Sequence, residues 1–345
     1  MELLLCGNWL GKDGLFKASI GRVKLLKSLG DIEPLNLGFL VISYSMAEES
    51  VNVKVKASNL PPIIMLEIQD LSPLAFKPER IKLRELGSSL DEEDYKERVK
   101  RAKELIADGV IYQLNLTCRF DFGLEGNPKD LFLNYYRAQP VPYAFFLDME
   151  GFYLISGSME LFLEKREETV RSKPIKGTSK SKEELLNSLK DRAENLMITD
   201  MVRNDLSKIA LSGSVKVREL FKVEAYSTLF QMHSEVVART KESLPDILMA
   251  TFPPASVVGA PKKKAVETID LLEPNSRDYY CGCAGLIKGE DFTLSVLIRT
   301  ALGFGELVHY YAGAGIVWDS EPQREWEEVR LKSLAFRRVS YNEGG

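Results

Sequence analysis

Alternation of apolar and polar residues predicts a half-buried strand over residues 110–120. Apolar residues occupy the even positions from Val110 to Phe120, and polar residues occupy the odd positions from Gln113 to Arg119. Because successive side chains of a strand point to opposite faces, this strand would have one apolar and one polar face. Such strands are typical of antiparallel sheets. The polar face either lines a cleft or faces solvent, and the pattern fits both.

Helical periodicity alternates with further strand-like runs. We expect helices over residues 89–108, where Ser89 and Glu92 form a capping-box pattern, over 183–210 with a break near Asn187, and over 322–337. Strands are expected over 37–44, 62–68, 143–147 and 152–156 and in a meander of 279–287, 292–303 and 306–317. This mixture of helices and antiparallel strands predicts the α+β class.

Two regions differ in what they carry. Residues 1–85 hold short strands and no catalytic motif, so we expect this reduced N-terminal part to complete the sheet. Residues 86–340 hold every candidate for chemistry, and we expect them to form one compact domain with residues 1–85. The chain has 345 residues, of which 45% are hydrophobic and 28% charged, as is usual for a globular protein.

Charge and composition exclude several classes of protein. The net charge of -4 gives no reason to expect a nucleic-acid partner. Four cysteines are too few for a disulfide framework, and two histidines exclude a multi-histidine metal site. No apolar run is as long as a membrane span, and the N-terminus lacks a signal-peptide pattern. We therefore expect a cytoplasmic enzyme with no membrane partner.

Lys176 lies in the stretch Arg171-Ser-Lys-Pro-Ile-Lys-Gly-Thr178. Pro174 fixes one backbone angle, and Gly177 allows a turn or a close approach to a ligand. A lysine held between two such residues is a candidate nucleophile or anion-binding group. A solvated lysine in a basic loop fits the same octapeptide equally well.

Two glutamates lie among apolar residues. Glu160 has apolar neighbours on both sides, which would raise its pKa and suit it to donate a proton. The simpler interpretation is an outward side chain on an alternating strand. Glu194 lies on an apolar helical stripe, so it needs a partner or a metal, and Mg²⁺ is the natural candidate because it favours oxygen ligands.

The C-terminal region offers further candidates. Glu325, Glu328 and Lys332 share one helical face, where Glu328 and Lys332 would form a surface ion pair or the carboxylates would bind a metal. Arg299 ends an apolar strand and is a candidate clamp for a carboxylate. The run Gly313-Ala-Gly315 offers bare backbone that a ligand could approach.

Taken together, these segments resemble the chorismate-utilising enzymes. The resemblance covers about residues 89–338 and rests on separate motifs that occur in the same order. They are Tyr112-Gln-Leu-Asn-Leu116, Ser158-Met-Glu-Leu-Phe162, Pro174-Ile-Lys-Gly-Thr178, Glu194-Asn-Leu-Met197, Arg203-Asn-Asp-Leu206, Val258-Gly-Ala-Pro-Lys262, Ile298-Arg-Thr300, Gly313-Ala-Gly-Ile-Val317 and Glu325-Trp-Glu-Glu-Val-Arg-Leu-Lys332. The family implies two antiparallel sheets packed as a sandwich, with helices outside and the active site in the cleft between them.

Lysine at position 176 resembles the aminodeoxychorismate synthase branch, since anthranilate synthases usually carry alanine there. The resemblance implies that Lys176 attacks C2 of chorismate while Glu160 protonates the departing 4-hydroxyl. Ammonia would then displace the lysine and give 4-amino-4-deoxychorismate, the precursor of para-aminobenzoate and folate. A lysine nucleophile must be uncharged.

The resemblance also implies the binding groups. Glu194 and Glu328, with Glu325 close by, would bind Mg²⁺, which would hold the ring carboxylate with support from Lys332. Contacts to the rest of the substrate are expected from Tyr280, Arg299, Gly313, Gly315, Ser256 and Thr178. No glutaminase motif is found, so a glutamine amidotransferase subunit is the implied partner and ammonia source.

Three features depart from the family pattern. Gln231 stands where histidine is usual, with His233 two residues later, and Met159 replaces a proline. A motif linked to tryptophan binding is missing, so feedback inhibition by tryptophan is not expected. Anthranilate synthase component I is the main alternative function. Isochorismate or salicylate synthesis and a non-catalytic binding subunit are weaker alternatives.

Overall fold

The strands form one long antiparallel sheet that curls around the molecule. A computed structural model describes every residue except 10, 12–13, 226–229 and 342–345. One half of the hydrogen-bonded path runs through β12 (Lys216–Ala225), β13 (Phe230–Arg239), β10 (Thr169–Lys173), β9 (Leu161–Arg166), β16 (Asp291–Val296), β15 (Cys283–Gly289), β3 (Leu35–Ile42) and β4 (Ile63–Pro73). The path then continues through β2 (Leu15–Leu26), β1 (Glu2–Gly7), β7 (Tyr143–Met149), β8 (Phe152–Ser158), β17 (Thr300–Phe304), β18 (Leu307–Ile316), β6 (Gln113–Glu125) and β5 (Lys82–Ser88).

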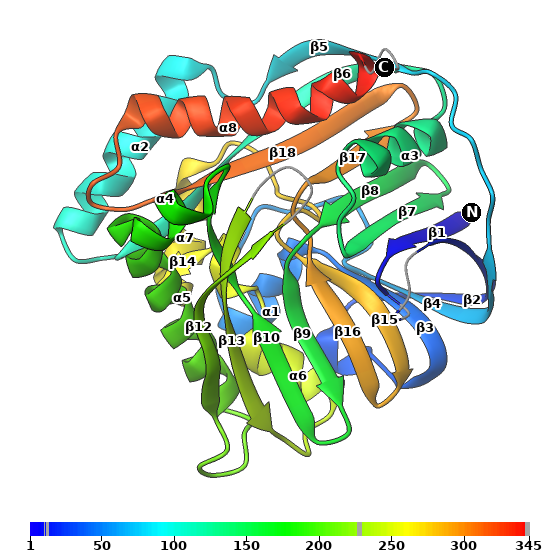
Figure 1. The fold of residues 1–345 in the computed structure, drawn as a ribbon, viewed down its shortest axis with the longest axis horizontal. Coiled ribbons are helices and arrows are strands. Elements are labelled where there is room, and N and C mark those ends of the chain that lie inside the picture. The colour runs from blue at the N-terminus through cyan, green and yellow to red at the C-terminus, as the bar shows by residue number, and fades with distance from the viewer. Residues whose placement is uncertain (10, 12–13, 226–229, 342–345) are drawn as a thin grey trace.

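The α+β class and the antiparallel pairing are as expected, but the division into two separate sheets is not seen. β2 pairs with both β4 and β1, and β1 also pairs with β7. These N-terminal strands join the two halves of the path, so hydrogen bonding runs from β12 to β5 without a break (Figure 1). Two short strands complete the sheet: β11 (Ile175–Ser179) pairs with β13, and β14 (Gly259–Ala260) pairs with β6.

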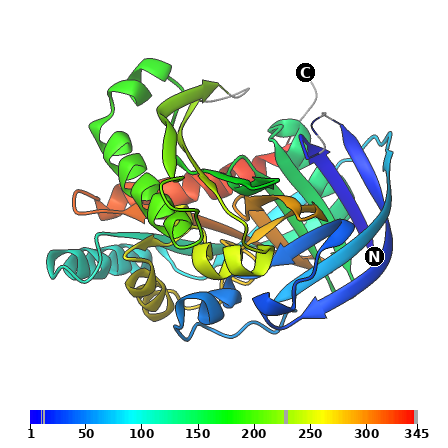
Figure 2. The same cartoon turned by 90° about the horizontal axis from the view of Figure 1, so that it is seen from below.

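Helices pack against the strands near both ends of this path. α8 (Pro322–Arg337) packs on β18 and on α2 (Glu92–Ala107), while α4 (Lys182–Asn187) and α5 (Leu189–Ser207) lie beside β13 (Figures 1 and 2). The remaining helices are α1 (Ala47–Val51), α3 (Pro128–Ala138), α6 (Leu244–Thr251) and α7 (Lys262–Leu272), with 3₁₀ turns at Leu29–Asp31, Tyr44–Met46, Ala255–Val257 and Arg338–Tyr341. Among the described residues, no helix combines the length and apolarity needed to cross a bilayer.

Helix ends follow from their capping residues. α2 starts at Glu92 because Asp91, not Ser89, accepts a hydrogen bond from a backbone N–H of the first turn. The Ser89 hydroxyl instead accepts from the backbone N–H of Arg119, so the expected capping box is wrong. The break expected near Asn187 is confirmed, because Ser188 is extended and its side chain caps α5.

The expected strand 292–303 is two strands with different partners. β16 pairs with β9 and β15, whereas β17 pairs with β8 and β18. Arg299, between them, has a φ of 52°, which ends the extended conformation. The chain thus leaves one part of the sheet and enters another at Arg299.

Candidate active site

Eleven of the twelve sequence-predicted site residues line one cavity of about 710 Å³. Its walls come from β11 and β13, near one end of the curled sheet, from β6 and β18 near the other end, and from α5 and α8. The lining set includes Glu160, Lys176, Thr178, Glu194, Ser256, Tyr280, Arg299, Gly313, Gly315, Glu328 and Lys332. Its size is that of a small-molecule site. Glu325 is the exception, since its side chain is almost fully buried next to the cavity.

Lys176 lies at an irregularity of β11. The pairing of β11 with β13 shifts between Ile175 and Thr178, and Gly177 has a φ of 93°. A Cβ atom at Gly177 would lie 2.9 Å from Asp191, so glycine is required both by conformation and by space. The Lys176 amine lies across the cavity close to β18, where a Cβ atom at Gly315 would be 3.6 Å from its Nζ. The lysine is therefore held against the cavity wall.

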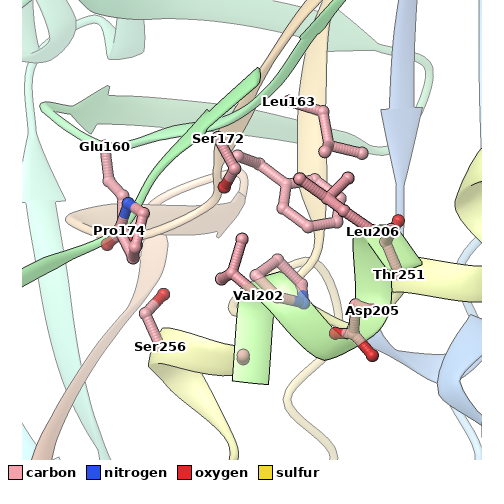
Figure 3. Close-up of a pocket in the computed structure, with 12 residues that line it drawn as sticks. Glu160, Leu163, Ser172, Pro174, Val202, Asp205, Leu206, Thr251 and Ser256 are labelled. Atoms are coloured by element: carbon pink, nitrogen blue, oxygen red, sulfur yellow. The ribbon is translucent and has the colours of Figure 1, made fainter. Parts of the chain in front are cut away.

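Glu160 is buried in the wall of the same cavity. Burial raises the pKa of Glu160 to about 7, although a hydrogen bond from Ser256 and the charge of Lys176 oppose the rise. Glu160 and Ser256 also line a second, water-sized cavity of about 10 Å³, together with apolar side chains such as Val202 (Figure 3). A carboxyl with this pKa can donate a proton near neutral pH.

Three glutamates and three lysines gather at the α5–α8 side of the cavity. The Lys332 Nζ donates hydrogen bonds to Glu328 at 2.6 Å and to the Gly313 carbonyl at 2.7 Å. The Lys190 Nζ lies 4.0 Å from a carboxylate oxygen of Glu194 and 3.8 Å from one of Glu325. These acidic groups come from two separate helices, so the fold itself brings them together.

The pKa values of these glutamates reflect both burial and neighbouring charges. Burial raises the pKa of Glu194, against the charges of Lys176 and Lys190. Burial also raises the pKa of Glu325, against a hydrogen bond from Ser320 and the charge of Lys190. Although burial acts in the same direction on Glu328, the charge and hydrogen bond of Lys332 hold its pKa below the ordinary value. Repulsion by Glu328 raises the pKa of both other carboxyls, which an additional cation would relieve.

The donor chemistry here fits a hard divalent cation. Carboxylate oxygens are the ligands that Mg²⁺ prefers, and the Lys190 ammonium already stands as a cation between Glu194 and Glu325. The described residues contain no three His, Cys, Asp or Glu side chains with the spacing of a preformed metal site.

Other residues that line the cavity are suited to an organic anion. Tyr280 stacks on Tyr311, with ring centroids 5.4 Å apart and planes 12° from parallel. Arg299 projects from the turn between β16 and β17 into the cavity. A Cβ atom at Gly313 would lie 2.8 Å from the Asn115 side chain, so glycine allows β18 to approach β6 closely. The polar face of β6 thus faces inward, and Asn115 lines the cavity.

Other cavity residues were not among the predicted contacts. Lys190 lies one helical turn before Glu194, and this i, i+4 spacing is the signal that could have identified it. Tyr311 shares a strand face with Gly313 and Gly315, which period-2 alternation could have shown. Neither signal is specific without knowledge of which elements meet.

Of the two candidates for the missing family histidine, Gln231 lines the cavity. Its carbonyl oxygen is buried and has no hydrogen-bond partner within the part of the chain that the structure describes. His233 lies instead beside β12, with its ring nitrogens 3.6 Å from the carboxylates of Glu219 and Glu224. The position of Gln231 makes it the residue available to a ligand.

Comparisons with known proteins identify the family of this chain. The chorismate binding enzyme family matches residues 41–338. Anthranilate synthase component 1 of Aquifex aeolicus is 36% identical over 73% of this chain and 54% of its own length. Aminodeoxychorismate synthase component 1 of Escherichia coli is 38% identical over 70% of this chain and 56% of its own. The chain thus spans little more than half the length of these relatives.

A solved structure has the same fold. The menaquinone-specific isochorismate synthase of Escherichia coli superposes with a TM-score of 0.79 over 98% of this chain and 88% of its own, at 18% identity. The names of the two relatives and of this solved structure state three different activities. The comparisons therefore do not decide which reaction this chain catalyses, and the reaction has to be inferred from its own residues.

Proposed function

Since the chain belongs to the chorismate-binding enzymes, a family of chorismate-utilising enzymes, we propose that it is the chorismate-converting component of an aminodeoxychorismate synthase. The reaction would be chorismate plus ammonia to 4-amino-4-deoxychorismate plus water. One observation carries the proposal: the cavity contains a lysine, Lys176, at the position where the anthranilate synthases resembled by this chain usually carry alanine.

In the first step, the uncharged Lys176 amine would add to C2 of chorismate. The two ring double bonds would shift from C1=C2 and C5=C6 to C1=C6 and C4=C5, the C4–O bond would break, and the Glu160 proton would leave with the oxygen as water. Hydroxide is a poor leaving group, so this step needs a proton donor. The pKa of about 7 supports this role, because Glu160 then holds its proton near neutral pH.

In the second step, ammonia would add at C4, both double bonds would return to C1=C2 and C5=C6, and the bond from C2 to Lys176 would break. The proton released by the new C4 ammonium would restore the lysine or Glu160, so the cycle needs no external acid. Gln231 lines the cavity with a free carbonyl oxygen, which supports the presence of a polar ligand there. We propose that a glutamine amidotransferase subunit supplies the ammonia.

Glu194, Glu325 and Glu328 would hold Mg²⁺ once Lys190 and Lys332 release them. When bound, the ion would neutralise these carboxylates and supply positive charge to the ring carboxylate of chorismate. Arg299, Tyr280 and the backbone at Gly315 would contact the enolpyruvyl carboxylate, with Ser256, Thr178 and Gly313 beside the substrate. Cationic and N–H donors along this wall support an anionic substrate.

Product analysis tests the proposal directly. The full chain would be incubated with chorismate, an ammonium salt and MgCl₂, and the products separated by liquid chromatography and identified by mass spectrometry. We expect 4-amino-4-deoxychorismate, which an added lyase converts to para-aminobenzoate. Fluorescent anthranilate formed without a lyase would instead support anthranilate synthase component I, and isochorismate would support the third activity.

A matched pair of variants tests the lysine. Lys176→Ala should lose aminodeoxychorismate formation, because no other group would form the covalent adduct. Lys182→Ala removes an exposed lysine from the start of α4 and should retain activity. Formation of the product by Lys176→Ala at the wild-type rate would show that the proposed nucleophile is wrong.

A further inference from the structure

Lys190 occupies an unusual position for a helix lysine. Its Nζ lies 4.0 Å from a Glu194 oxygen and 3.8 Å from a Glu325 oxygen, so it bridges two helices by charge. Both distances exceed that of a hydrogen bond. The ammonium therefore stands between the two carboxylates without being tightly bound to either.

The residues of this bridge differ in how deeply they are buried. The Glu325 and Glu194 side chains are 3% and 13% exposed, whereas the Lys190 side chain is 53% exposed. The carboxylates are thus fixed in the wall, and the lysine reaches them from solvent. A long, exposed side chain can withdraw without disturbing the packing of either helix.

The local helix does not explain why a lysine is favoured here. Lys190 is in the first turn of α5, where the helix dipole disfavours a cation. Lysine placed before glutamate at i, i+4 is also the weaker order for a surface pair. The remaining explanation for a lysine at this position is its place between Glu194 and Glu325, a carboxylate of another helix.

The charge of Lys190 has a consequence for the binding of a divalent cation. Lys190 and Lys332 place their positive charges beside Glu194, Glu325 and Glu328. A divalent cation entering among the carboxylates would meet the Lys190 ammonium in the same space, and like charges at such distances repel. One of the two cations must leave.

We propose that Lys190 is a resident counter-cation, which the divalent metal displaces from between Glu194 and Glu325. The inference rests on the metal site of the proposed function. Lys190 keeps the carboxylates paired in the metal-free protein and weakens binding of free metal. Its removal makes the site more acidic and the metal affinity higher.

Metal titration without chorismate tests this. The full chain is stripped with chelator, and Mn²⁺ binding is followed by electron paramagnetic resonance, with Mg²⁺ as competitor. Lys190→Gln and Lys190→Ala should each bind Mn²⁺ about tenfold more tightly, as expected for removing a unit charge near a divalent ion. Lys190→Arg keeps the charge and should stay close to wild type, as should Lys182→Gln on α4.

The outcomes separate the inference from the proposed function. If the wild type binds Mn²⁺ and the two neutral variants bind it no more tightly, the counter-cation role is overturned while the metal site stands. If only the neutral variants bind, the role is supported strongly. If none binds, both the role and the metal site are overturned. A lower melting temperature of Lys190→Gln in chelator, reversed by metal, would independently support the role.

Discussion

Arg277 and Glu273 form a two-point ion pair inside the protein, with contacts of 2.6 and 2.9 Å between the guanidinium and the carboxylate. Both side chains are at most 5% exposed. Arg277 also donates to the carbonyls of Val257 and Asn115, at 2.9 and 2.6 Å. The pair therefore ties the turn that carries Ser256 to β6, on which Asn115 lines the cavity.

Glu273→Gln should destabilise the protein by about 3–5 kcal/mol, because it leaves a buried guanidinium without its counter-charge. Urea unfolding followed by circular dichroism measures the change. The control is Glu267→Gln on α7, the helix that ends just before Glu273; it breaks an exposed pair with Lys264 and should cost no more than about 1 kcal/mol. Equal effects of the two substitutions would contradict the importance of the buried pair.

Ser256→Ala should shift the pH dependence of catalysis. The Ser256 hydroxyl favours ionised Glu160, so its removal raises the pKa of Glu160 above its present value of about 7. Because the protonated form acts as the acid, the decline of kcat/KM on the alkaline side should move to higher pH. Rates must be measured at constant free ammonia. An unmoved alkaline limb would argue against Glu160 as the titrating acid.

Glu160→Gln should lose activity yet change how stability depends on pH. The pKa of Glu160 rises from an ordinary 4.5 to about 7 on folding, so its stabilisation is complete below pH 4.5 and is lost as pH rises through 7. Wild type should therefore lose up to roughly 3 kcal/mol relative to Glu160→Gln between pH 4.5 and 8. Denaturant titrations across this range, with exposed Glu150→Gln as control, provide the measurement.

Gly315→Ala should impair substrate binding more than folding. The new methyl would lie 3.2 Å from the Gln113 amide and 3.4 Å from a Glu194 oxygen, contacts that small side-chain shifts can relieve. It would also project into the cavity beside the Lys176 amine. We expect a higher KM for chorismate and a lower kcat with little change in melting temperature. Gly123→Ala on β6, where a Cβ atom would make only ordinary contacts of 3.8 Å or more, should leave both unchanged.

Periodicity located most helices and strands because each depends on nearby residues. The helix 322–337 and the break near Asn187 follow from local pattern and capping. The prediction of one strand over 292–303 was wrong because its run of apolar residues continues across Arg299, whose positive φ accompanies a change of sheet partner. No local signal marks such a change.

The candidate site shows a similar limit. Glu160 and Glu328 each had a plain structural explanation, and Glu194 needed either a partner or a metal. Only the joint resemblance of the motifs to one family favoured the functional interpretation. That Lys190 reaches Glu325 depends on how α5 meets α8, which no pattern within either helix specifies. The polar face of β6 likewise could not be assigned to cavity or solvent until β18 was placed beside it.

The continuous path of the sheet through β2 and β1 limits how far the chain can be shortened. A fragment starting near residue 86 would keep every candidate catalytic side chain but would expose the edges of β15 and β7, which β3 and β1 now cover. Bare strand edges recruit other chains. Such a fragment should aggregate when expressed, and adding residues 1–85 as a separate polypeptide should restore a soluble complex.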